Sequence, residues 1–412
     1  MVFLMDRILK LFQRRTDRAQ KAASSTTQTH GQSQQQQPLA QHDGPSETSQ
    51  GNTQTQNKAA VNRSAVATGS LQIQLQNRSN SNAVYAYITG LALQQNNQLF
   101  LLQADAKTPY YPPNPSSPGT PLAANISIPL GAPGSTVTAT IPQLAGGRIW
   151  FSIGAPLVFA VNPGPGLVEP SIFNPQDPNH DIHFGFVEMT FDRSQVFVNI
   201  SYVDFVGPAV ALTLTDTSNT SQHVSGMPAN GMQTVAANLT AQTQKDGRRW
   251  SSLIVTDANN QLLRILSPNS AILLHPDWFQ TYWTDYVNQV YSQYNQRALT
   301  VSTQASYGYV RGQVGGKGNL NFGAGGLFAK PSAKDIFGCN TGPFATGQNA
   351  EMNVIIPRLA AAFNRSTLLL TDTVPDGERV DQYYAAATTN HYARIVHAAN
   401  LDGRGYAFPY DD

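Results

Sequence analysis

Two acidic residues of this sequence lie inside strongly apolar runs, where an ionised carboxylate is costly to bury. Glu188 stands in FGFVEMTF (184–191), and Asp204 stands in SYVDFVG (201–207). A carboxyl group in such a setting needs partners or shifts its pKa, and groups of this kind are enriched where proteins transfer protons. Glu188 and Asp204 are therefore candidates for acid and base catalysis, with structural hydrogen bonding or outward exposure as the alternatives.

The sixteen-residue separation of Glu188 and Asp204 is even, which favours one shared face. A hairpin closed by a three-residue loop at 193–195 would put both acids on that face, whereas a two-residue loop would put them on opposite faces. In the three-residue register Glu188 faces Ile200, and the acids are out of step by roughly 13 Å at about 3.3 Å per residue. Catalysis by water attack needs two carboxyl groups roughly 6.5–9.5 Å apart, so twist, curvature or a bulge must close the difference.

Further polar side chains extend this candidate site along the same strands. Thr190 and Asp192 share the face of Glu188, and Tyr202 shares that of Asp204, so a polar strip results. Aromatic rings together with abundant amides suit an uncharged polyol, which binds through ring stacking and neutral hydrogen bonds. Candidates for the stacking, although aromatic residues at helical spacing are usually core, are Trp150, Trp250, Trp278 and Trp283.

The elements that must position these residues begin at about residue 70. Short alternating or β-branched runs, bounded by Gly, Pro and Asn, follow one another up to residue 227, which is typical of a sandwich or barrel. Helices are expected at 232–247, after Pro276, and within 354–364 and 388–400. We predict a mainly β protein: a β-sandwich or barrel domain over 70–227, a mixed α/β domain over 228–399, and a return segment over 400–412.

The first 69 residues differ in composition from the rest. Residues 22–69 are rich in Gln, Ser and Thr and have almost no large apolar residue, so we expect them to be disordered. Residues 1–21 combine apolar residues at helical spacing with basic ones, which indicates a short amphipathic segment for a membrane surface or partner, or a frayed helix. Charged residues interrupt its apolar run, so it matches a secretory signal poorly.

Composition and spacing exclude several other classes of function. The chain has 26 Lys+Arg, of which 8 lie in residues 1–69, and 25 Asp+Glu, of which 4 lie there. The rest of the chain is therefore slightly acidic, and it lacks the basic stripe that binding to nucleic acid requires. No stretch reaches the ~18 apolar residues of a membrane span. The Gly-rich run 315–326 does not follow the P-loop pattern, and the histidines form no metal-ligand cluster. Cys339 is the single cysteine, which excludes an intramolecular disulfide.

Several longer runs follow one another in an order typical of a known family: VYAYITG (84–90), GGRIWFSIG (146–154), VEPSIFNPQDPN (168–179), FGFVEMTFD (184–192), NISYVDFVG (199–207), PSAKDIFGC (331–339) and residues 390–412. They resemble glycoside hydrolase family 64, from about residue 70 to the end. The resemblance implies an endo-β-1,3-glucanase with a thaumatin-like β-domain packed on a mixed α/β domain. It also implies inverting hydrolysis of β-1,3-glucan in an open groove between the domains, release of short laminari-oligosaccharides, and no metal or organic cofactor.

The resemblance assigns roles to the two acids. The family's general acid falls on Glu188, which would protonate the departing glycosidic oxygen, and its general base falls on Asp204, which would activate water on the opposite ring face. The acid needs a raised pKa, for which the flanking Phe186, Val187 and Met189 offer a low-dielectric setting.

This chain also departs from the family pattern. Thr190 matches a polar substrate-lining position, but Asp192 falls where the family more often has Asn. Family members usually continue beyond GYAFPYDD (405–412) into a last strand, without which the β-domain would have an open edge. Secreted relatives begin with a signal peptide, so an extracellular or cell-wall location is implied by resemblance alone. Asn199 heads a glycosylation sequon, but it lies in a predicted strand beside the site, where glycosylation is not expected.

Two other functions compete with hydrolysis. A non-catalytic, thaumatin-like β-glucan-binding protein would use the same aromatic and amide surface, but it would have no reason to keep an intact acid pair. A structural or partner-binding role centred on residues 1–69 is the third alternative. The partner expected under the main hypothesis is a β-1,3-glucan polysaccharide, and the sequence does not indicate an oligomeric state.

Overall fold

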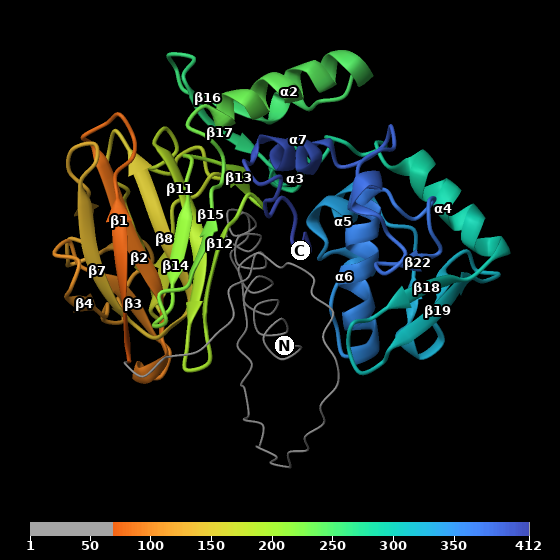
Figure 1. Ribbon diagram of the computed structural model, residues 1–412, viewed down its shortest axis with the longest axis horizontal. Coiled ribbons are helices and arrows are strands. Elements are labelled where there is room, and N and C mark those ends of the chain that lie inside the picture. The colour runs from red at the N-terminus through yellow and green to blue at the C-terminus, as the bar shows by residue number, and fades with distance from the viewer. Residues whose placement is uncertain (1–68, 412) are drawn as a thin grey trace, which may run out of the picture. The chain divides into compact units, whose positions relative to one another are not determined.

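A computed structural model describes residues 69–411 of the chain (Figure 1). The amphipathic segment expected at 1–21 and nearly all of the tract at 22–69 lie outside the described residues. The described part is mainly β, with several separate sheets and a smaller set of helices. Every helix in this part is too short or too polar to span a bilayer.

The largest sheet occupies the first half of the described chain and carries the expected strands. Its order is β12-β11-β8-β2-β3-β4, with β6 paired to β2, and all its pairings are antiparallel. The inner strands are buried along most of their length, because the apolar runs of the sequence are covered on both faces. The strands are β2 (Val84–Ala92), β3 (Gln98–Leu102), β4 (Pro109–Tyr110), β6 (Ile128–Pro129), β8 (Leu144–Ile153), β11 (His183–Phe191) and β12 (Val196–Ile200).

Smaller antiparallel sheets accompany the large one. The first strand of the described chain pairs along its full length with β7, from Ser70↔Pro142 to Gln76↔Thr136. A three-stranded sheet has the order β10-β9-β5, and β14 and β15 form an isolated hairpin. These strands are β1 (Ser70–Gln76), β5 (Thr120–Pro121), β7 (Thr136–Pro142), β9 (Ala160–Asn162), β10 (Gly166–Val168), β14 (Leu212–Thr215) and β15 (Ser221–Val224).

Helices begin at residue 231, as the sequence predicts. The first, α2 (Gly231–Asp246), ends at Gly247, whose φ of 67° is the left-handed conformation that glycine adopts readily at a helix C-terminus. The helix expected after Pro276 is α4 (Thr284–Gln296), and Val287, Val290, Tyr291 and Tyr294 are buried along one face of it. The remaining helices are α3 (Pro268–Leu274), α5 (Ala333–Gly338), α6 (Ala350–Arg365) and α7 (His391–Ala399).

Two more sheets lie among these helices. One has the order β13-β17-β16, and the other has the order β21-β20-β19-β18-β22 with a parallel pairing between β18 and β22. Their strands are β13 (Phe205–Val206), β16 (Ile254–Thr256), β17 (Leu262–Leu266), β18 (Leu299–Ser302), β19 (Tyr309–Val314), β20 (Leu320–Asn321), β21 (Leu327–Phe328) and β22 (Thr373–Val374). Strand β13 precedes the predicted domain boundary at residues 227 and 228, and β17 follows it, so their pairing joins the two predicted domains. The boundary stays a prediction.

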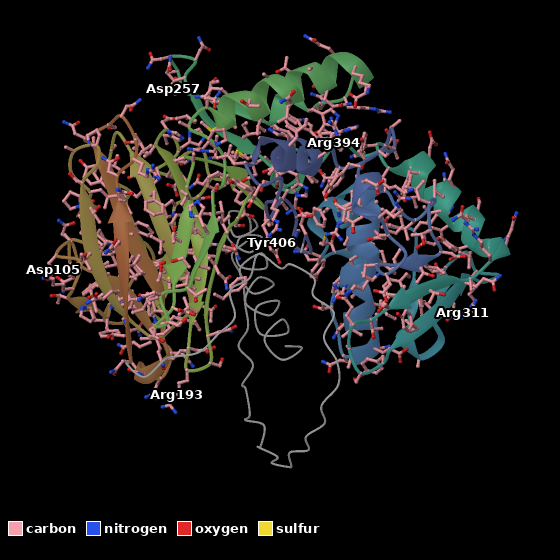
Figure 2. The ribbon with its side chains drawn as sticks, viewed as in Figure 1. Asp105, Arg193, Asp257, Arg311, Arg394 and Tyr406 are labelled. Atoms are coloured by element: carbon pink, nitrogen blue, oxygen red, sulfur yellow. The ribbon has the colours of Figure 1, made fainter. Side chains whose placement is uncertain are left out.

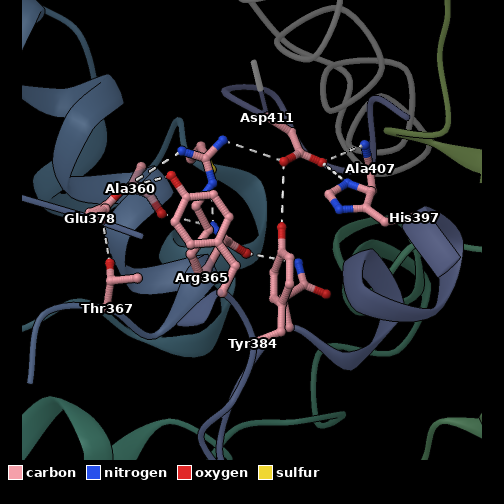
Figure 3. A network of polar contacts seen from close by, with 12 residues as sticks. Ala360, Arg365, Thr367, Glu378, Tyr384, His397, Ala407 and Asp411 are labelled. Atoms are coloured by element: carbon pink, nitrogen blue, oxygen red, sulfur yellow. Dashed lines mark hydrogen bonds and ion pairs between the residues drawn. The ribbon is translucent and has the colours of Figure 1, made fainter. Parts of the chain in front are cut away.

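A buried polar cluster holds the C-terminal segment in place (Figure 3). Arg365 at the end of α6 pairs with Glu378 at 4.0 Å and with Asp411 at 3.5 Å. Burial opposes the charge of Arg365, but Asp411, Glu378 and the two neighbouring tyrosines together outweigh it and raise the pKa of the guanidinium. Asp411 also accepts hydrogen bonds from Tyr384 and the Ala407 backbone, and His397 Nε2 lies 2.6 Å from its Oδ2.

Replacing Arg365 with Met should lower the free energy of unfolding by about 3–5 kcal/mol, because Glu378 and Asp411 would lose their buried cation. Chemical denaturation measures this loss. The matched control is Arg379→Met, which breaks the exposed pair with Asp381 and should leave stability unchanged. Equal stability of wild type and Arg365→Met would contradict a structural role for the cluster.

Candidate active site

A buried arginine on β8 gathers the acidic residues of the candidate site. Arg148 Nη1 lies 3.0 Å from Glu169 Oε2, and its Nη2 lies 3.3 Å from Glu188 Oε1. Burial disfavours the charge of this guanidinium, but the carboxylates of Glu169, Glu188 and Asp204 outweigh that effect and raise its pKa. Both predicted acids therefore act on one cation, which places them in the same region of the molecule.

Glu188 occupies the middle of a row of side chains that crosses four strands. Its cross-strand partners are Arg148 on β8 and Asn199 on β12, and Thr89 on β2 faces Arg148 in turn. The Glu188 side chain is 14% exposed, so it is largely buried but remains in contact with solvent. This position combines a cation, a neutral amide and limited water access around one carboxyl group.

The apolar setting of Glu188 differs in part from the prediction. Phe186 lies on the same face, and the Arg148 guanidinium stacks over its ring at 4.2 Å, with Trp150 next to Phe186. Val187 and Met189 are buried, but strand alternation directs them to the other face of the sheet. Only one of the three flanking residues therefore lowers the dielectric around the carboxyl group.

The predicted hairpin register is wrong by one residue. Glu188 pairs with Asn199, not with Ile200. Between the two strands, the Asp192 N–H donates to the Gln195 carbonyl at 3.0 Å, which closes a tight turn around residues 193 and 194. Asp192 makes the tight loop possible, because its Oδ1 accepts hydrogen bonds from the backbone and hydroxyl of Ser194 and from the Gln195 backbone. Arg193 projects from the tip of this hairpin (Figure 2).

Asp204 nevertheless joins the site, because the strand that would have carried it ends earlier. Strand β12 stops at Ile200, and the chain bends over 201–204, so the alternation of faces no longer applies there. After the bend, Phe205 pairs with Leu266, and the Asp204 carbonyl accepts a hydrogen bond of 3.0 Å from the Ser267 backbone. A β-sheet pairing and the start of α3 thus determine the position of Asp204.

A glycine lets the segment that carries Asp204 lie directly against β11. A Cβ atom on Gly207 would stand 2.6 Å from the carbonyl oxygen of Phe184 and 3.2 Å from the Cα of Gly185. No larger residue fits that separation without a shift of backbone. Because of this close approach, Glu188 and Asp204 both interact electrostatically with Arg148, although they belong to different strand pairings.

Tyr202 supports the bend and does not present its ring to solvent. It is 4% exposed, and its hydroxyl donates to Asn400 Oδ1 at 3.1 Å. Its backbone N–H donates to the Tyr406 carbonyl at 2.7 Å, and its carbonyl accepts from the Tyr392 hydroxyl at 2.6 Å. Burial and the nearby charge of Asp204 raise the pKa of Tyr392, so its phenol stays neutral beside that acid. Tyr202 therefore leaves no exposed ring for a sugar.

The remaining predicted site residues lie at different distances from this centre. Thr190 is half-buried on the face of Glu188, opposite Phe197 and beside an irregularity in the β8–β11 pairing. Three of the candidate tryptophans, Trp150, Trp250 and Trp283, are core residues with at most 1% exposure. Trp278 is half-buried, and its ring stacks on His275 at a centroid distance of 4.2 Å.

The predicted absence of a histidine cluster and the state of the single cysteine can be compared with the described residues. No group of three or more His, Cys, Asp or Glu side chains in residues 69–411 is placed to hold a metal ion. Cys339 is buried, and burial raises the pKa of its thiol well above the usual range. A buried neutral thiol is a poor nucleophile.

Arg148 and Glu169 were not predicted from the sequence, and neither was the pairing of Asn199 with Glu188. Arg148 carries the same signal that marks Glu188, because it is a charged residue inside the apolar strand GGRIWFSIG (146–154). Glu169 directly follows the short strand β10, and nothing in its immediate sequence indicates a buried partner. Asn199 was expected beside the site, but its pairing with Glu188 follows only from the register.

A family model covers all of the described residues. The model of glycoside hydrolase family 64, described as β-1,3-glucanase, matches residues 69–412. The chain belongs to this family. A glucan endo-1,3-beta-glucosidase of Cellulosimicrobium cellulans is 26% identical over 283 residues, which cover 67% of this chain and 50% of that protein. The chain thus spans about half the length of the curated relatives it matches.

Solved structures show the same fold. A laminaripentaose-producing β-1,3-glucanase in complex with laminaritetraose is 31% identical, with a TM-score of 0.74 and coverage of 84% of this chain and 93% of that one. A family 64 β-1,3-glucanase domain from Clostridium beijerinckii is 23% identical, with a TM-score of 0.64 and coverage of 84% and 92%. The second likeness concerns the fold alone.

Replacing Arg148 with Met should lower the free energy of unfolding by about 3 kcal/mol, because Glu169 and Glu188, which are only 23% and 14% exposed, would lose their cation. Arg148→Lys keeps the charge but cannot reach two carboxylates in the same geometry, so an intermediate loss is expected. Arg311→Met, on the exposed face of β19, is the control and should have no effect. Unchanged denaturation of Arg148→Met would show that this arginine does not organise the acids.

Proposed function

We propose that this family 64 chain hydrolyses β-1,3-glucan with inversion and releases short laminari-oligosaccharides. Glu188 acts as the general acid and Asp204 as the general base. The observation that carries the proposal is the convergence of both carboxyl groups on the Arg148 guanidinium, each from a different backbone pairing. A thaumatin-like β-domain packed on a mixed α/β domain is the architecture proposed to present them.

The chemical steps follow from the two protonation states. Glu188, protonated, donates its proton to the glycosidic oxygen as the bond from that oxygen to the anomeric carbon breaks. Asp204, ionised, takes a proton from a water molecule, which attacks the anomeric carbon from the opposite face. Charge develops on the sugar ring in an oxocarbenium-like transition state, beside two carboxyl groups that can stabilise it. Metal and organic cofactors have no part in this scheme.

The surroundings of the acids support a neutral polysaccharide as substrate. Thr190 offers a hydroxyl on the face of Glu188, and Asp192 continues that line toward the hairpin loop. We propose that Thr190 and Asp192 both line the bound glucan. The main contribution of Asp192 is to hold the shape of the hairpin loop. The solved laminaripentaose-producing relative was obtained with laminaritetraose, which is consistent with a β-1,3-linked ligand for this fold.

Glu188→Gln and Asp204→Asn should each lose about 10²–10⁴-fold in turnover on laminarin while the protein still folds, because each keeps the shape of its side chain and Glu169 still pairs with Arg148. Initial rates of reducing-end release measure the loss. Glu351→Gln and the exposed Asp277→Asn are matched controls and should keep full activity. Retained turnover in both site variants would contradict the assigned roles.

The substrate class is tested by product chromatography after incubation with laminarin and with a β-1,4-glucan. Short β-1,3 oligomers from laminarin alone are expected, and they should be absent with Glu188→Gln. If laminarin gives no products but still retards the wild-type protein in an affinity gel, the chain is a non-catalytic glucan-binding protein.

A further inference from the structure

A buried amide oxygen without a partner stands across the sheet from the proposed acid. Asn199 on β12 is the direct cross-strand partner of Glu188, so both side chains project from the same face with Cβ atoms about 4.5–5.5 Å apart. Its Oδ1 atom is buried and accepts no hydrogen bond. Such an acceptor is costly to leave unsatisfied, and the group that could satisfy it must be a donor.

Arg148 is the cation that contacts Glu188, and two further carboxyl groups share it. Arg148 on β8 contacts the carboxyl group directly, and Glu169 and Asp204 face the same guanidinium from the end of β10 and from the segment before β13. A neighbouring cation favours an ionised carboxyl group. A general acid must instead keep its proton until the substrate takes it, so some other neighbour has to favour the neutral form.

Asn199 can distinguish the two protonation states of Glu188 although it carries no charge. An ionised carboxylate offers no donor, and Oδ1 remains unsatisfied beside it. A protonated carboxyl group has an O–H that Oδ1 can accept. The amide therefore favours the protonated state, in the direction opposite to the effect of Arg148.

We propose that Asn199 is a positioning residue that holds the catalytic proton on Glu188 by accepting its hydrogen bond. The role in catalysis rests on the proposed function, but the effect on the Glu188 proton does not. Arg148 orients the carboxyl group from one side, and Asn199 retains the proton from the other.

The direct test measures the protonation of Glu188 without any substrate. The chain contains five glutamates, Glu47, Glu169, Glu188, Glu351 and Glu378, so 13C labelling of the glutamate carboxyl carbon gives few NMR signals. The signal that disappears in Glu188→Gln belongs to Glu188. In Asn199→Leu this signal should titrate about one pH unit lower than in wild type, which is roughly a tenfold loss of proton affinity.

A second variant keeps the test decisive if Asn199→Leu folds poorly. Asn199→Asp has nearly the same shape and supplies a stronger acceptor, so the Glu188 signal should titrate at higher pH than in wild type. Gln74→Leu removes an exposed amide from β1 and should leave the titration unchanged. If neither Asn199 variant moves the titration of Glu188, the proposal is overturned and Asn199 has only a structural role.

The pH profile of laminarin hydrolysis separates this inference from the proposed function. The alkaline limb of kcat/KM reports the proton on the acid, so it should move to lower pH in Asn199→Leu by the shift seen in the NMR titration. A shifted titration in a protein that hydrolyses no glucan would support the proton-holding role and contradict the proposed function. A shifted titration with an unmoved alkaline limb would contradict Glu188 as the acid that Asn199 serves.

Discussion

A buried guanidinium group must be surrounded by anions, and this requirement organises the candidate site. Arg148 lies in the centre of the largest sheet, where water cannot solvate its charge. Glu169 and Glu188 contact it directly, and Asp204 adds its field from a separate segment of the chain. Carboxylates that would otherwise repel one another are thereby held together in one region.

The position of Asp204 depends on residues from the far end of the chain. The bend before it is held by hydrogen bonds from Tyr202 to Asn400 and Tyr406, and Ser201 forms a bridge with Tyr406. The same C-terminal segment is fixed further on by the Arg365 cluster, through Asp411. The geometry of the acid pair therefore depends on two buried arginines: Arg148, which contacts Glu188, and Arg365 at the end of α6.

Much of the architecture was accessible from the sequence because it follows from local rules. Alternating apolar residues predicted the strands of the large sheet, and Gly247 predicted the end of α2, both of which the structure confirms. The acids Glu188 and Asp204 were marked by the cost of a charge in an apolar run. The hairpin register was wrong because side-chain hydrogen bonds from Asp192 select a two-residue loop, which alternation of faces does not reveal.

What the sequence could not show is the set of contacts between distant segments. The bend that ends β12 at Ile200 depends on partners about two hundred residues away, so the parity of Asp204 carried no information about its face. The same assumption of alternating faces predicted Tyr202 beside the substrate, but its side chain is buried and its hydroxyl donates a hydrogen bond to Asn400. Arg148 was visible as a charge in a strand, but its three acidic neighbours come together only through the fold.

The stereochemistry of the first product tests most directly the view that Glu188 and Asp204 act from opposite faces of the sugar. Proton NMR of laminarihexaose during the first minutes of hydrolysis resolves the anomeric signals before mutarotation mixes them. Inversion predicts that the α-anomer appears first, because water on Asp204 attacks opposite the bond that Glu188 protonates. Initial release of the β-anomer would contradict the account, since it requires a covalent intermediate and a different task for Asp204.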